Sequence, residues 1–339
     1  MPKAVIIDIA TDVPAKVVSN ADLESRNIGW TAEQIQAKTG IAERRVAADG
    51  ECSSDLAVRA AEKLFKKGRV KPEQIDFLLF CTQSPDYFLP STACMLQDRL
   101  GLSLNCGAFD YNLGCSGYVV GLSLAKALIE SEQARCVLLL TGETYSKFIH
   151  PQDRSVCTLF GDGASATAVQ ADPSAPAGLD QFVFGTDGRG WRTLIVPAGG
   201  MRLPRSTQTA QESMDEDGIT RSQDNLHMNG KEIFRFALQV VQKTVQRLLD
   251  VANVAKEDID FLVLHQANRF MLDELNKRLR LPIEKVPYEF ADVGNTVSAT
   301  IPIVLERMVD HQRLQRGHRL LLVGFGVGYS WAGGIITWR

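Results

Sequence analysis

The feature that most constrains the fold is an internal repeat. The run Glu73–Gln83 (EQIDFLLFCTQ) is repeated in Glu257–Gln266 (EDIDFLVLHQ), at an offset of 184 residues (257 minus 73). A second pair of apolar runs, Cys136–Leu140 and Arg319–Val323, stands at nearly the same offset. Two matches in register predict a duplicated unit.

Each copy of the first run follows an amphipathic helix pattern, Asp55–Lys67 in one and Lys231–Val251 in the other. Apolar, β-branched runs alternate with helical stretches in both halves, which predicts an α/β protein with mainly parallel sheets. The Pro- and Ala-containing segment 171–178 predicts a junction. We therefore expect an N-terminal half over residues 1–172 and a C-terminal half over residues 173–339.

Bulk composition narrows the class of protein. The chain has 339 residues, 45% of them hydrophobic and 23% charged, which suits a globular protein with two core-sized units. A net charge of -3 argues against a nucleic-acid binder. The N-terminus reads as a first strand and not as a signal peptide, and no apolar stretch is long enough to span a membrane. The seven cysteines form no CxxC pair, so we expect neither a disulfide framework nor a metal site, and a cytoplasmic location.

One cysteine stands in a distinctive context. Cys115 lies between Gly114 and Ser116-Gly117, where an apolar strand leads into a long helix with one charge, Lys126, over residues 116–129. Such an apolar helix belongs in the middle of the molecule. Unpaired amides and the helix dipole at a helix start favour a thiolate, so we expect a nucleophile. Free cysteines are more often small core residues, however, so Cys115 alone does not establish one.

Two further groups complete a candidate set. His265 follows the apolar run Leu262–Leu264, and strand ends are where α/β sheets place reactive groups. Asn295 lies in a Gly-Asn-Thr turn, which needs no catalytic explanation by itself. The other histidines are expected in loops or on charged surfaces: 150, 227, 311 and 318.

The order Cys, His, Asn is shared by papain-like proteases. That alternative is weak here, because the C-G-[SA]-C-[WY] signature is missing and the cysteine helix reads as buried, whereas a protease must admit a polypeptide. The polar stretch 201–225 lacks periodicity and predicts a surface excursion, a lid or wall of a binding site.

Across its whole length the sequence resembles the β-ketoacyl-acyl carrier protein synthase III family of the thiolase superfamily. The matching runs, in colinear order, are Lys38–Arg45, Pro90–Cys94, Phe160–Ala164, His265–Asn268, Gly294–Thr296 and Gly324–Trp331. The resemblance implies a thiolase-like fold: two pseudo-symmetric halves in a layered αβαβα arrangement with two central mixed five-stranded sheets. It also implies a homodimer.

The implied reaction has two parts, with acyl-CoA and malonyl-acyl carrier protein as substrates and no bound cofactor. Cys115 accepts the acyl group, with the backbone amides of Cys115 and Val327 as the oxyanion hole. His265 Nε2–H and the Asn295 amide then stabilise the enolate that forms when the malonyl group loses carbon dioxide.

The resemblance also implies binding residues. Lys38, Arg154, Gln34 and Lys231 fall where coenzyme A docks, Phe160 resembles the residue lining the acyl pocket, and Leu89 one donated across the dimer. A basic helix face with Arg235, Arg269 and Lys277 would suit an acidic carrier protein, although charged helix faces are usually only solvated.

Several positions depart from the family pattern. Gln34 replaces a tryptophan that stacks on adenine, with Trp30 four residues earlier, and Lys231 replaces an asparagine near the pantetheine arm. Because catalytic groups are kept while substrate-contacting groups differ, we expect a specialised homologue. The alternative is an acyltransferase that passes the acyl group of Cys115 to an oxygen or nitrogen nucleophile without forming a carbon–carbon bond. A non-enzymatic scaffold is a remote third reading.

Overall fold

A computed structural model describes residues 2–339. The first of its two large sheets has the strand order β1-β7-β6-β4-β5. Strand β4 is parallel to both neighbours, and β7 is antiparallel to β6 and β1, so the sheet is mixed. Its strands are β1 (Lys3–Asp12), β4 (Phe77–Cys81), β5 (Gly107–Tyr111), β6 (Cys136–Glu143) and β7 (Gly163–Asp172).

The second sheet repeats this pattern with one strand fewer. Its order is β13-β14-β15-β8, with β13 and β14 parallel and the other pairs antiparallel. Its strands are β8 (Leu179–Thr186), β13 (Phe261–Leu264), β14 (Arg319–Gly326) and β15 (Ser330–Thr337). The predicted duplication is therefore visible in the order in which each half threads its sheet.

The expectation of five strands in the second sheet was wrong. By analogy with β5, a fifth strand would follow α8 (Arg269–Leu279) and pair with β13. In this region Gln266 instead donates from Nε2 to the carbonyls of Leu264 and Pro287, and its Oε1 accepts from the amide of Glu289. A side chain thus satisfies the backbone beyond β13, and Pro287 has no amide proton to offer a ladder.

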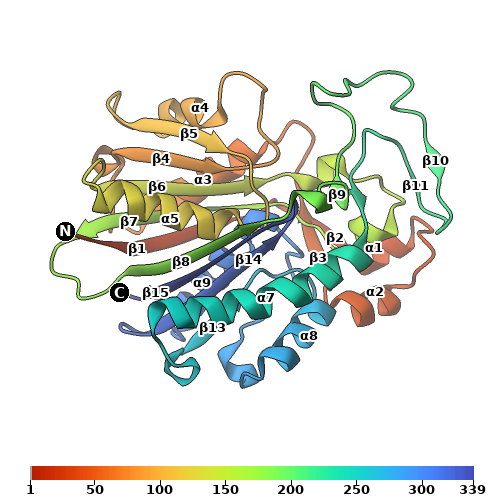
Figure 1. Cartoon of the computed structure of the whole chain (residues 1–339). Helices are drawn as coiled ribbons and strands as arrows, with labels where there is room; N and C mark the ends of the chain where they lie inside the picture. Colours follow the sequence, from red (N-terminus) through yellow and green to blue (C-terminus); the bar gives the residue numbers. More distant parts are fainter. Residues whose placement is uncertain (1) are drawn as a thin grey trace.

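The helices form three layers with the two sheets between them (Figure 1). In the middle, α5 (Gly117–Glu130) and α9 (Thr300–Asp310) pack against both sheets in one buried cluster. Outside the first sheet lie α3 (Ser53–Lys66) and α4 (Thr92–Arg99), and outside the second lie α7 (Gly230–Ala252) and α8 (Arg269–Leu279). This is the predicted αβαβα arrangement.

Both faces of the central strands are buried, which explains their continuous apolar sequence. In β6, Val137 and Leu139 face the middle helices, whereas Leu138 and Leu140 face α3. The glycines of α5 allow a close approach: a Cβ on Gly121 would stand 2.2 Å from Tyr111 Oη. The nearly uncharged sequence of α5 is thus the sequence of a helix in the innermost layer.

The remaining elements surround one end of the sheets. They are β2 (Lys16–Ser19), α1 (Asn20–Glu24), α2 (Ala32–Thr39), β3 (Glu43–Val46), α6 (Arg154–Cys157), β9 (Leu194–Ile195), β10 (Ser213–Met214), β11 (Thr220–Arg221) and β12 (His227–Met228). The predicted excursion 201–225 carries the short hairpin β10–β11, at the right of Figure 1. Among residues 2–339, no helix has the length and apolarity needed to cross a membrane. The division at residue 172 stays a prediction.

Candidate active site

Cys115 lies in the turn between β5 and α5, two residues before the first helical residue, and its side chain is buried. Glycines of β14 make room for this turn. A Cβ on Gly324 would stand 2.5 Å from the carbonyl oxygen of Cys115, and one on Gly326 would stand 3.0 Å from Cys115 Sγ. The nucleophile candidate Cys115 therefore packs closely against strand β14 of the second sheet.

The expectation that this site favours a thiolate was wrong for the free protein. Burial raises the pKa of the Cys115 thiol well above its usual range, Glu143 adds to the effect, and the Cys115 amide opposes it only weakly. A helix N-terminus contributes at most about 2 kcal/mol, a factor of about 30 in acid dissociation, and does not reverse the sign. Burial also raises the pKa of Glu143 to about 8. Glu143 is therefore mostly uncharged at pH 7, and burial is then the main barrier to ionisation of Cys115.

His265 directly follows β13, as predicted, and is buried. Its amide donates to the carbonyl of Val323 at 2.9 Å, and its Nδ1 lies 2.8 Å from Thr300 Oγ1. Burial lowers the pKa of His265 to about 3, so the imidazole is neutral at physiological pH. A neutral ring can donate one hydrogen bond without carrying charge into the site.

Asn295 is held by the segment 159–161 and by its own loop. Its amide donates to the carbonyl of Leu159 at 2.8 Å, and its carbonyl oxygen accepts from the Gly161 amide at 3.0 Å, beside Phe160. Asn295 Oδ1 accepts from the Val297 amide at 2.9 Å. With Oδ1 engaged, the side chain presents its NH₂ group, a donor.

Residue Val297 links the three candidates. It packs with Cys115 and Phe160 in one buried cluster, and its amide holds Asn295. Its carbonyl lies 3.0 Å from Thr300 Oγ1, which also contacts His265. The structure thus brings the three loops to one place, although they are far apart in sequence.

Two backbone amides next to Cys115 are free. Within residues 2–339, neither the Cys115 amide nor the Val327 amide donates to another residue. Val327 also packs against the cluster that contains Cys115. Free amides near a nucleophile are suited to stabilise an oxyanion.

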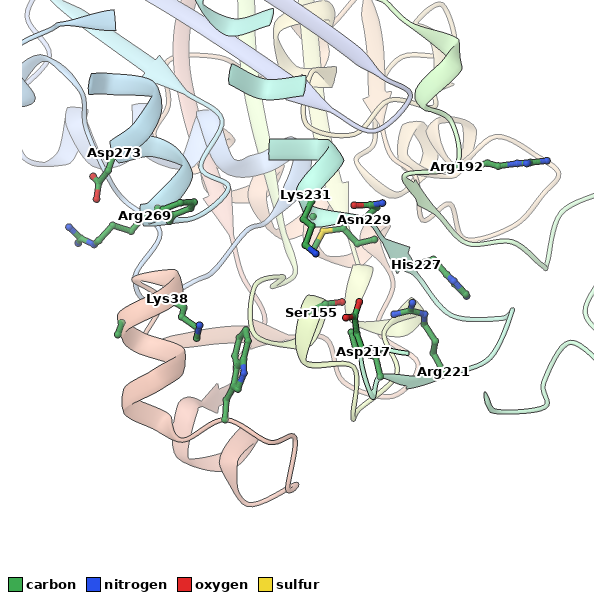
Figure 2. A pocket seen from close by; sticks show the side chains of 16 residues that line it. Lys38, Ser155, Arg192, Asp217, Arg221, His227, Asn229, Lys231, Arg269 and Asp273 are labelled. Atoms are coloured by element: carbon green, nitrogen blue, oxygen red, sulfur yellow. The ribbon is translucent and has the colours of Figure 1, made fainter. Parts of the chain in front are cut away.

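A cavity of about 1150 Å³ opens beside this cluster. Met228 lines the cavity and also packs against the cluster of Cys115. Figure 2 shows Lys231 reaching from α7 toward the side formed by Ser155 and Asp217, while Arg269 lies at the rim on α8. The hairpin of the 201–225 excursion supplies Asp217, Ile219 and Arg221, so the excursion forms part of the cavity wall; that this cavity is a binding site stays a prediction.

The predicted coenzyme A contacts are only partly brought together. Lys38 and Lys231 line the cavity, and Lys38 lies over the ring of Trp30, 5.0 Å from its centroid. Gln34 does not line it; its Oε1 accepts from the Thr31 amide and caps α2. Arg154 donates to the carbonyl of Asp217 and supports the hairpin from outside.

The other predicted binding residues differ in how close they lie to Cys115. Phe160 is buried beside Cys115, whereas Leu89 is 86% exposed. Arg235 pairs with Glu232 at 3.0 Å and Lys277 with Glu274 at 3.9 Å, each on its own helix. Only Arg269 of the three docking residues lines the cavity.

Sequence reasoning missed Glu143 and Thr300. Glu143 is wholly buried at the end of β6, where it accepts from the amide of Gln83 and from Ser84 and Ser298. The sequence contained a signal for Glu143: it is an acidic residue at the end of the largely apolar strand β6, just as His265 follows the apolar strand β13. Within residues 2–339, no group of three or more His, Cys, Asp or Glu side chains is arranged to hold a metal ion.

The layered fold with a cysteine at the start of its central helix, a histidine after β13 and an asparagine loop defines a thiolase-like protein. Residues 109–188 match the 3-oxoacyl-[acyl-carrier-protein (ACP)] synthase III family and residues 249–338 match its C-terminal family. The chain is 37% identical to "Beta-ketoacyl-[acyl-carrier-protein] synthase III" of Caldanaerobacter subterraneus subsp. tengcongensis over 98% of this chain and 97% of the relative. The chain belongs to the β-ketoacyl-[acyl-carrier-protein] synthase III family.

Solved structures agree. One 3-oxoacyl-(acyl-carrier-protein) synthase III superposes with a TM-score of 0.98 at 54% identity, covering 99% of this chain and 100% of the other. The synthase III of Thermus thermophilus gives 0.87 at 36% identity, covering 99% of both chains. The priming β-ketosynthase of the R1128 polyketide pathway gives 0.85 at 30% identity, covering 100% of this chain and 98% of the other.

Proposed function

We propose that the protein is a β-ketoacyl synthase that joins an acyl group from acyl-CoA to malonyl-acyl carrier protein with loss of carbon dioxide. The observation that carries the proposal is the meeting of Cys115, His265 and Asn295 around Val297 in a chain of this family. The specialised role expected from the sequence stays part of the proposal.

In the first half-reaction Cys115 Sγ attacks the acyl-CoA carbonyl. The Sγ–acyl bond forms, the bond from the acyl carbon to the coenzyme A sulfur breaks, and the thiol proton leaves with coenzyme A. The free amides of Cys115 and Val327 are our candidates for the oxyanion hole, each worth about 3 kcal/mol in such sites.

In the second half-reaction the malonyl carboxylate leaves as carbon dioxide and its electron pair forms an enolate. The enolate carbon attacks the acyl carbon, the bond to Cys115 Sγ breaks, and the thiolate takes up a proton. Neutral His265 and the Asn295 NH₂ group suit an enolate oxygen as donors. This role requires that the Thr300 hydroxyl donates to His265 Nδ1, which leaves the ring proton on Nε2.

Acyl-CoA would enter through the 1150 Å³ cavity. Lys38, Lys231 and Arg269 supply cations for its phosphates. Trp30 lines the cavity, whereas Gln34 does not, and its ring supplies the aromatic face for adenine that the tryptophan replaced by Gln34 supplies in the family. For the carrier protein we retain Arg269, Arg235 and Lys277 as docking residues. All three are exposed on α7 and α8.

We also propose a homodimer. Strand β5 lies at the edge of the first sheet and carries the exposed Phe109, and the loop between β4 and α4 exposes Tyr87, Phe88 and Leu89. An exposed apolar sheet edge of this kind suits a second copy. All seven cysteines are free, which supports a reducing, cytoplasmic location.

The test is to mix the protein with a panel of acyl-CoAs and malonyl-acyl carrier protein. We expect carbon dioxide release and a β-ketoacyl product, with an acylated Cys115 detected by intact mass. Asn295→Ala should load Cys115 but lose condensation. If that variant forms full product, the acyltransferase alternative is correct; if Cys115 loads but no acyl group condenses, the proposal is wrong.

A further inference from the structure

A second cavity beside Cys115 has one polar wall. It has a volume of about 310 Å³, and its apolar side includes Leu194, Leu226 and Val327. These residues belong to, or pack against, the cluster that contains Cys115 and Phe160. On the proposed function, an acyl chain carried by Cys115 has this space next to it.

Three side chains make the polar wall. Tyr145 Oη donates to Gln83 Oε1 at 2.5 Å, and Gln83 Nε2 donates to Asn112 Oδ1 at 3.0 Å. All three line the cavity, and they come from separate segments of the first half. Gln83 follows β4, Asn112 follows β5 and Tyr145 follows β6, so the parallel ends of three strands bring them together.

The wall begins close to the nucleophile. A Cβ on Gly114 would stand 2.6 Å from Gln83 Oε1 and 2.7 Å from Val327 Cγ1. Gly114 immediately precedes Cys115, so the Gln83 amide and the apolar Val327 side chain meet beside the same backbone position. A polar group on one of the first carbons of an acyl chain would therefore meet this wall.

The direction of the hydrogen bonds decides what the wall offers. Tyr145, 4% exposed, uses its only proton on Gln83. Gln83 uses Oε1 and one Nε2 proton within the chain, and Asn112 uses Oδ1. The second Gln83 Nε2 proton and both Asn112 Nδ2 protons have no acceptor within residues 2–339. The wall thus offers N–H donors.

We propose that this wall selects acyl groups that carry a hydrogen-bond-accepting oxygen, a hydroxyl or a keto group, near the thioester. An unsubstituted acyl chain would cover these donors without satisfying them, and a site built to bond an oxygen rejects an analogue that lacks it. The inference rests on the proposed function, because it needs the acyl group on Cys115.

The test compares 3-hydroxybutyryl-CoA, as each enantiomer, with butyryl-CoA. The readout is kcat/KM for acylation of Cys115, in which Sγ replaces the coenzyme A sulfur and coenzyme A leaves as its thiol. We expect at least one hydroxylated enantiomer to be favoured by about tenfold, the upper end of what one hydrogen bond contributes. Equal rates, or a preference for butyryl-CoA, would overturn the inference.

Two variants test whether the polar wall causes the preference for hydroxylated acyl-CoA. Tyr145→Phe removes the hydroxyl that fixes the Gln83 amide, and Asn112→Leu removes the outer donors; each should reduce the preference several-fold. Asn105→Leu, at an exposed position outside the cavity, is the matched control and should keep it. Because Asn112 is exposed, the oligomeric state of its variant is also measured. Tyr145 is buried, so its variant tests the wall without altering an exposed surface. A preference that survives both variants would overturn the assignment.

The two proposals fail in different ways. If no acyl-CoA of either kind loads Cys115, the proposed function fails. If butyryl-CoA loads and condenses as well as its hydroxylated counterpart, the synthase assignment stands and only the polar-wall inference fails.

Discussion

His265 Nδ1 lies 2.8 Å from the hydroxyl oxygen of Thr300, and both groups are buried. The same hydroxyl lies 3.0 Å from the carbonyl of Val297. Its single proton can serve only one of these acceptors. The proton on His265 therefore depends on Thr300: if the hydroxyl donates to Nδ1, the neutral ring carries its proton on Nε2.

The first prediction concerns this positioning contact. Thr300→Val should reduce condensation by about tenfold or more while acylation of Cys115 is retained, because Nδ1 loses the partner that fixes the ring. Thr300→Ser keeps the hydroxyl and should restore most of the rate. Single-turnover acylation and product formation are measured separately. An equal loss in both steps would indicate a general structural defect.

The second prediction concerns the charge of Glu143 beside Cys115. Glu143, with its pKa raised to about 8, is ionised at pH 9 and opposes formation of the thiolate. Glu143→Gln should therefore increase alkylation of Cys115 by iodoacetamide at pH 9 by roughly three- to tenfold, with little change at pH 6.5.

Exposed Cys94 provides an internal control, since its alkylation should not respond to the variant. Peptide mass spectrometry reports both sites in one sample. In the wild type, alkylation of Cys115 should still rise with pH up to pH 9, because burial raises its pKa; a plateau below pH 8 would contradict this.

The third prediction is a pH dependence of stability. The pKa of His265 falls from 6.5 in the unfolded chain to about 3 in the folded protein. Between these values the unfolded state binds more protons, so the stability present above pH 6.5 is lost as the pH falls toward 3, by roughly 4 kcal/mol for a fully buried ring. His265→Gln is uncharged throughout and should lose less stability over this range. Denaturant unfolding at pH 7, 6, 5 and 4 gives the difference between the two proteins, and parallel curves would refute it.

The duplication and the places of Cys115 and His265 were predictable, because they depend on local patterns. An apolar run that ends at a histidine predicts a strand end, and a helix with one charge predicts the innermost layer. The low acidity of Cys115 was not predictable, because it depends mainly on how completely the fold buries the thiol, and Glu143 adds to it only through the pairing of β4, β5 and β6. The missing fifth strand depends on Gln266 bonding Pro287 and Glu289, contacts that sequence patterns do not encode.

The fourth prediction concerns the glycine behind the nucleophile. In Gly324→Ala the new Cβ would stand 2.5 Å from the Cys115 carbonyl and 2.8 Å from Ser116 Cα, which are backbone atoms that cannot rotate away. The free energy of unfolding should fall by about 1–3 kcal/mol, and acylation should slow because the turn must shift. Gly200→Ala, where a Cβ meets nothing within 4 Å, is the control. If Gly324→Ala keeps the stability and the acylation rate of the wild type, the turn at Cys115 can accommodate a Cβ and the prediction is wrong.

The last prediction concerns the hairpin over the large cavity. Arg221 of β11 pairs with buried Asp153 at 3.0 Å, which ties the hairpin to the body of the protein, and with Asp215 of the same hairpin at 2.7 Å. Asp215→Asn removes the hairpin carboxylate that helps to hold Arg221 in place against Asp153, while Asp215 itself does not line the cavity. Because a partly exposed ion pair is worth up to about 1 kcal/mol, KM for acyl-CoA should rise by at most about fivefold, with kcat little changed.

Limited proteolysis gives an independent readout of the same tie. In Asp215→Asn we expect faster cleavage within residues 201–220, and saturating acyl-CoA should slow that cleavage, because the hairpin forms a wall of the cavity that would hold the substrate. Asp49→Asn, at an exposed position remote from the hairpin in sequence, should match the wild type in both assays. A raised kcat with an unchanged KM would instead mean that the hairpin limits product release, and the assignment of Arg221 as an anchor for substrate binding would be wrong.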